Sequence, residues 1–197
     1  RLVGSEMCIR DSSYSCMTLL STLIFDTASD EQKAEWVETI AKMGEEVISR
    51  EPEIADYLAG DFNRVTYLGS GSFGGLAQES QLKILELAHG LVATSYDTSM
   101  GYRHGPKSFV DDKTLVFVFV NNDAYTRQYD IDILNEIGGD KIAQHTVAVQ
   151  QDGATVYEGE SFTFKFKTGS NLKGSGLVGE DDDKLYMAGK QAVSYTH

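Results

Sequence analysis

From residue 64 onward, short segments rich in β-branched and aromatic residues alternate with longer helical patterns. The segment TLVFVFV at residues 114–120 is apolar on both faces, which is typical of a strand buried between two layers. Strands that alternate with helices usually form a parallel sheet covered on both faces. We therefore predict an α/β fold, a three-layer α/β/α sandwich, with strands at 65–68, 91–96, 114–120 and 142–150 and helices at 76–89 and 123–137.

The N-terminal part of the chain has helical patterns. Residues 14–25 are apolar almost all round, which is typical of a buried helix whose packing partner need not lie in this fragment. Between residues 30 and 49, apolar residues recur at helical spacing after Ser29, a suitable N-cap. Pro52 ends this helix, and a short helix at 53–58 precedes the first strand.

The C-terminal part has weaker patterns. Residues 162–166 alternate like an edge strand, residues 169–179 are rich in glycine, and residues 180–183 are acidic. We expect this region to be mostly loop, with one strand.

The acidic composition excludes some classes of partner. The 197 residues are 41% hydrophobic, which is enough for a core, and the formal net charge is -13. Such a charge repels nucleic acids and anionic membranes, so we expect neither as a partner. No apolar run approaches the roughly 20 residues of a membrane span. A small anionic substrate is still possible where backbone amides at a helix N-terminus supply positive charge.

The residues at the two ends of the chain can be encoded by the two complementary strands of one short DNA sequence. Residues 7–12 can be encoded by atgtgtataagagacag, whose reverse complement encodes residues 193–197 after a codon ending in ct. Residues 1–6 resemble the remainder of a sequencing adapter. We therefore interpret residues 1–12 and 193–197 as adapter-derived, foreign sequence.

This interpretation removes Cys8 and His197 from any site. Cys16 is then the only native cysteine. A single thiol forms no intrachain disulfide and favours a reducing compartment, so we expect a cytoplasmic protein.

The loop after the first predicted strand, GSGSFG at residues 69–74, fits the pattern G-x-G-x-x-G. A dinucleotide site would require an acidic residue roughly 20 positions later, and Asp97 fits this only loosely. The glycines could instead serve a tight strand-to-helix turn. In a third interpretation, Ser70, Gly71 and Ser72 bind a phosphate or sugar hydroxyls at the helix N-terminus. All three interpretations stay open at this point.

The helix that follows carries three charged residues on one face. Glu79, Lys83 and Glu86 are spaced i, i+4 and i+7 on an otherwise apolar helix. A solvated stripe with a Glu79–Lys83 ion pair explains this spacing. Alternatively, the helix places a carboxylate and an ammonium beside a ligand at the carboxyl ends of the strands, where the carboxylate acts as general base.

His104 lies in the segment GYRHGPK, on a predicted loop that follows a strand. Most single histidines are structural, but functional residues concentrate on such loops. His89 lies at the end of a predicted helix and His145 within a predicted strand, so neither position indicates a functional role. One native cysteine and scattered histidines predict no metal site.

Three motifs in this order resemble the sugar isomerase (SIS) domain family: YLGSGS from Tyr67, GLAQESQLKILEL from Gly75 and YRHGPKS from Tyr102. The resemblance extends through DDKT from Asp111 and YTRQYD from Tyr125. It is greatest to the branch of tagatose-6-phosphate ketose/aldose isomerases and galactosamine-6-phosphate deaminases, in which two SIS domains share one chain.

The resemblance implies a flavodoxin-like SIS fold and a domain organisation. Residues 13–59 would be the C-terminal helices of a truncated first SIS domain with a linker. Residues 60–192 would be a second SIS domain, truncated at its C-terminus.

The resemblance also implies roles for the candidate residues. In the isomerase domain of glucosamine-6-phosphate synthase, the residue that matches Glu86 moves a proton between C1 and C2. Lys83 matches the lysine beside that carboxylate, Glu79 the acidic residue one turn earlier, and His104 the ring-opening histidine. The segment between Glu86 and His104 is longer here. In that relative the histidine comes from the neighbouring subunit, so the resemblance implies a homodimer with a shared active site.

The implied activity is aldose/ketose isomerisation or deamination of an amino-sugar 6-phosphate, without a cofactor. We expect an enzyme in the full-length protein and an inactive fragment in isolation. Two alternatives are a non-catalytic SIS module that binds a sugar phosphate and regulates another protein, and a dinucleotide-binding oxidoreductase domain.

Overall fold

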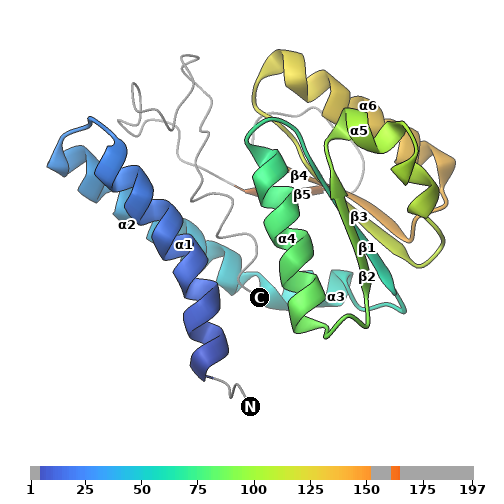
Figure 1. The fold of residues 1–197 in the computed structure, drawn as a ribbon, viewed down its shortest axis with the longest axis horizontal. Coiled ribbons are helices and arrows are strands. Elements are labelled where there is room, and N and C mark those ends of the chain that lie inside the picture. The colour runs from blue at the N-terminus through green and yellow to red at the C-terminus, as the bar shows by residue number, and fades with distance from the viewer. Residues whose placement is uncertain (1–4, 152–160, 165–197) are drawn as a thin grey trace. The chain divides into compact units, whose positions relative to one another are not determined.

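The computed structural model describes residues 5–151 and 161–164 (Figure 1). The described residues up to Ala59 form one compact unit, and those from Gly60 onward form a second. The glycine-rich and acidic segments at 169–183 and the segment 193–197, which we interpret as adapter-derived, lie outside the described residues.

The N-terminal unit contains helices α1 (Ser5–Phe25), α2 (Asp30–Ser49) and α3 (Glu51–Tyr57). The predicted start of α2 is confirmed by a capping box. The Gln32 N–H donates to Ser29 Oγ at 3.3 Å, and the Ser29 N–H donates to Gln32 Oε1 at 3.1 Å. Helix α3 begins two residues before the prediction because Pro52 lies in its first turn, where the missing N–H costs nothing.

Helix α1 is longer than predicted and begins inside the segment that we interpret as foreign. Several of its apolar side chains are exposed in this chain. Phe25 is 84% exposed, Met17 64%, Ile24 63% and Leu20 50%. A helix that is apolar all round requires packing partners on every side, whereas these four side chains are exposed to water.

The second unit is built on a five-stranded parallel sheet of order β2-β1-β3-β4-β5. The strands are β1 (Arg64–Gly69), β2 (Ala93–Asp97), β3 (Thr114–Phe119), β4 (His145–Gln151) and β5 (Ser161–Phe164). Strand β5 pairs only with β4, so the predicted edge strand is confirmed. The order 2-1-3-4-5 is the flavodoxin-like arrangement, and the prediction of a parallel α/β sandwich is confirmed.

The helices of this unit lie on opposite sides of the sheet (Figure 1). Helix α4 (Phe73–Leu87) contacts β1 and β2. Helices α5 (Ser99–Arg103) and α6 (Ala124–Asp140) contact each other and the other face, together with the 3₁₀ helix η1 (Pro106–Phe109) beside α5.

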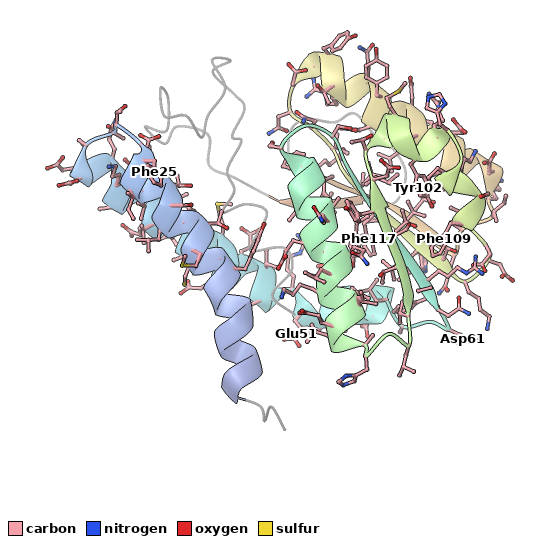
Figure 2. All side chains as sticks on the ribbon, in the orientation of Figure 1. Phe25, Glu51, Asp61, Tyr102, Phe109 and Phe117 are labelled. Atoms are coloured by element: carbon pink, nitrogen blue, oxygen red, sulfur yellow. The ribbon has the colours of Figure 1, made fainter. Side chains whose placement is uncertain are left out.

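The alternation of side chains along the strands separates two cores. On one face, Tyr67 stacks against Phe117 and Phe119, and Phe119 meets Phe73 of α4. On the other face, Leu68, Val116 and Val118 pack with fully buried residues of α5 and α6. Tyr102 of α5, labelled in Figure 2, is fully buried there, and its hydroxyl lies 3.1 Å from Thr66 Oγ1.

Candidate active site

Glu79, Lys83 and Glu86 form a line of ion pairs along α4, here called the ion-pair line. This line extends away from the glycine loop at residues 69–74. Helix α4 begins after β1 and runs antiparallel to the strands, so its C-terminal end lies at their amino ends. The Gln81 amide already donates to Thr94, the second residue of β2, at 2.6 Å. About 20 Å of helix separates Ser72 from Glu86. This geometry does not place Glu86 at the carboxyl ends of the strands, where one of the two interpretations of the charged face put a carboxylate and an ammonium.

The three charged residues on α4 do come together. Lys83 Nζ lies 3.4 Å from Glu79 Oε1 and 3.2 Å from Glu86 Oε2. Partial burial lowers the pKa of Lys83, but the hydrogen bond to Glu86 and the charge of Glu79 outweigh it, so the pKa is raised. Lys83 therefore stays cationic at neutral pH and holds both carboxylates.

The two carboxylates differ in access to water. The side chains of Glu79 and Lys83 are only 17% and 18% exposed, whereas that of Glu86 is 50% exposed. The line is therefore more buried than a solvated stripe would be. Of the two carboxylates, that of Glu86 is the more accessible to solvent.

The glycine loop has a structural reason for its glycines. A Cβ on Gly69 would clash with the Phe73 carbonyl oxygen, and Gly71 has φ of 62°. The amides of Phe73 and Gly74 donate to the carbonyls of Ser70 and Gly71, so these two amides are not free for a phosphate as expected. The exposed Ser72 makes no capping hydrogen bond with its side chain.

Ser70 belongs to a buried polar network centred on Asp130 of α6. Ser70 Oγ donates to Asp130 Oδ1 at 2.8 Å, and Ser99 Oγ donates to the same oxygen. The Asn121 N–H donates to Asp130 Oδ2 at 2.9 Å, and the Asn121 side-chain amide donates to the Ser70 carbonyl at 3.0 Å. The segments that follow β1, β2 and β3 thus share one carboxylate at the carboxyl edge of the sheet.

Our sequence interpretation missed Ser99, Asn121 and Asp130 as members of this network. Asp130 ends the YTRQYD motif, but its spacing gave it no role. It is fully buried. Burial raises the pKa of Asp130, and the hydrogen bonds from Ser99, Asn121 and Ser70 oppose this shift without cancelling it.

His104 lies on the opposite side of the sheet from Glu86. It caps the C-terminus of α5, and its neighbours Arg103 and Lys107 bond to Glu136 of α6. Because α4 covers the other face, the structure does not bring His104 and Glu86 of one chain together.

Asp97 also has a local role. Its Oδ1 accepts the Thr98 N–H at 2.7 Å. A Cβ on Gly101 would clash with the same oxygen, so the carboxylate packs against α5. This position gives no support to the dinucleotide interpretation.

The sheet order is that of a flavodoxin-like fold, and the similar proteins described next place the chain in the sugar isomerase (SIS) domain family. No model of a known protein family matches it. Within that class, it is 36% identical over 142 residues to D-galactosamine-6-phosphate deaminase of Shewanella sp. (strain ANA-3), which covers 72% of this chain and 36% of the relative. Over 95 residues it is 50% identical to the Escherichia coli enzyme of that name, covering 48% of this chain and 25% of the relative.

A solved structure agrees. The crystal structure of tagatose-6-phosphate ketose/aldose isomerase from Escherichia coli matches with a TM-score of 0.63 and 33% identity over 79% of this chain and 39% of the other. The C-terminal domain of glucosamine-fructose-6-phosphate aminotransferase from Francisella tularensis, at 17% identity and a TM-score of 0.59, shares the fold. The chain spans 25% and 36% of the two curated relatives above.

Among residues 5–151 and 161–164, none of the helices combines the length and apolarity needed to cross a bilayer. Within the same residues, no three histidine, cysteine, aspartate or glutamate side chains are grouped closely enough to hold a metal ion.

Proposed function

We propose that this chain is part of an amino-sugar 6-phosphate deaminase or isomerase in which Glu86 is the base that transfers a proton between C1 and C2. The observation that carries the proposal is the line of Glu79, Lys83 and Glu86, with Glu86 accessible and Lys83 cationic. The names of the relatives support the substrate class.

Each group has a defined chemical task. Opening of the sugar ring exposes the aldehyde at C1, and Glu86 removes the proton from C2 to give an enolamine or enediol. The Lys83 ammonium stabilises the developing oxyanion. Return of the proton to C1 completes isomerisation. With an amine on C2, the product is an imine, which water converts to the ketose with release of ammonia.

The geometry separates this chemistry from the glycine loop of the same chain. A hexose phosphate is shorter than the helix between Ser72 and Glu86, so it cannot contact both residues. We infer that the substrate phosphate is held by a different SIS domain. Residues 13–59 would then belong to that first domain and residues 60–192 to the second, and the isolated chain would be inactive.

The position of His104 supports a dimer. The histidine and Glu86 lie on opposite sides of one sheet, so a single chain does not supply both to one substrate. We propose that a second subunit contributes His104, as the family resemblance implies. Neither a metal nor an organic cofactor is needed for these steps, and the protein would act in the cytoplasm.

The substitution Glu86→Gln tests the proposal. It removes the base and keeps the shape, so turnover should fall by about 10²–10⁴-fold, the usual contribution of a positioned base. Release of ammonia from galactosamine-6-phosphate and glucosamine-6-phosphate would be measured on the protein made from the complete reading frame, with the isolated chain assayed beside it. Asp132→Asn, at an exposed carboxylate on α6, is the matched control.

Two outcomes would contradict the proposal. Unchanged turnover in Glu86→Gln would exclude Glu86 as the base. Binding of the sugar phosphates by the unsubstituted protein without formation of ammonia or ketose would identify a regulatory module instead.

A further inference from the structure

The loop that carries His104 is tied to helix α6 on both sides of the histidine. Arg103 Nε lies 2.6 Å from Glu136 Oε2, and Lys107 Nζ lies 2.6 Å from Glu136 Oε1. One carboxylate thus uses both oxygens to hold the residue before His104 and the residue three positions after it. Asp140, one turn later on α6, accepts a second contact from Lys107 at 2.6 Å.

The imidazole of His104 has no such anchor. In the part of the chain that the structure describes, its ring has no hydrogen-bond partner, and the residue is exposed. Only its backbone N–H is fixed, by donation to the Gly101 carbonyl at 3.2 Å. The position of the ring therefore depends on the backbone between Arg103 and Lys107.

The local secondary structure is too short to fix that backbone alone. Helix α5 has 5 residues and η1 has 4. Isolated helices of this length are unstable, so their geometry comes from tertiary contacts. The four side chains of the ion-pair network are 26–39% exposed and carry two charges of each sign. Partial shielding and shared partners make such a network more effective than isolated surface pairs.

We propose that Glu136 is a positioning residue for His104: its two ion pairs hold the histidine loop in the geometry that ring opening requires. This inference rests on the proposed function, since His104 has its role only there. The ion-pair network of Arg103, Lys107, Glu136 and Asp140 would then have a functional role although it touches no reacting atom. Glu136 would act entirely through the loop.

Kinetics on the complete protein test the coupling. Glu136→Gln should lower kcat at least about tenfold with little change in KM, since a displacement of about 1 Å can cost 10²-fold. In a His104→Asn background, Glu136→Gln should have no further effect, because the group it positions is gone. Glu53→Gln, which breaks the ion pair with Arg50 in the N-terminal unit, is the matched control and should leave kcat unchanged. An equal loss in both backgrounds would overturn the proposal.

A second readout does not depend on activity. In imidazole NMR spectra of the chain, Glu136→Gln should shift or broaden the His104 resonances and leave those of His89 and His145 in place. Unchanged His104 resonances would overturn the positioning role. Full turnover in His104→Asn would instead contradict the role of the histidine in the proposed function, and the NMR result would still decide whether Glu136 orders the loop.

Discussion

Two carboxylates of the α/β unit show how burial separates a structural group from a reactive one. Asp130 is fully buried, and three donors, each from the segment after a different strand, occupy its two oxygens. Glu86 is half exposed and has a single ammonium as partner. A carboxylate that is saturated by buried donors fixes the backbone around it, whereas an accessible one can still accept a proton from a substrate.

The largest expected difference between Asp130 and Glu86 is in how much their substitution changes the stability of the fold. Asp130→Ala removes the acceptor of Ser99 Oγ and of the Asn121 N–H, and the nearer acceptor of Ser70 Oγ, which also lies 3.3 Å from Ser99 Oγ. Each unsatisfied buried group costs about 1–3 kcal/mol. We expect a loss of at least about 3 kcal/mol in the free energy of unfolding, measured with urea. Glu86→Gln should change that free energy by less than about 0.5 kcal/mol, since exposed ion pairs contribute little. Comparable losses of unfolding free energy in Asp130→Ala and Glu86→Gln would contradict the distinction between a structural and a reactive carboxylate.

The two serines of the glycine loop provide a smaller contrast. Ser70 is buried and bonded to Asp130, while Ser72 is exposed and caps nothing with its side chain. Ser70→Ala should cost about 1.5 kcal/mol, the contribution of a hydrogen bond to a charged group. Ser72→Ala should stay within about 0.5 kcal/mol. Urea unfolding of both variants measures the contrast, and a costly Ser72→Ala would assign Ser72 a contact that the fold does not show.

The smallest expected effect is a pH dependence specific to Asp130. Burial raises its pKa above the ordinary value of 3.8, so the folded state binds the proton more tightly than the unfolded state. Its contribution to stability is therefore fully present below about 3.8 and is lost as the pH rises through the folded-state pKa. The stability difference between the unsubstituted protein and Asp130→Asn should shrink across that interval. Urea unfolding at several pH values would reveal it, and a difference that grows with pH would have the wrong sign.

Much of the fold could be predicted from local patterns. The alternation after residue 64 gave the parallel sheet, and Ser29 gave the start of α2, because periodicity and capping act within a few residues. The strand ends shifted by up to three residues, since pairing with neighbours sets where a strand begins. The line of Glu79, Lys83 and Glu86 was equally local, because helical spacing alone places these residues on one face.

Other features of the site required the tertiary structure. Ser70 and Asp130 are 60 residues apart in the sequence, and no local pattern indicates that they meet. The separation of Glu86 from the glycine loop depends on the direction of α4 against the sheet, and that of Glu86 from His104 depends on which face each helix covers. The sequence by itself determined which residue types stand on each element. Only the packing of the elements decided which of them share an environment, because burial and long-range contacts exist only in the folded chain.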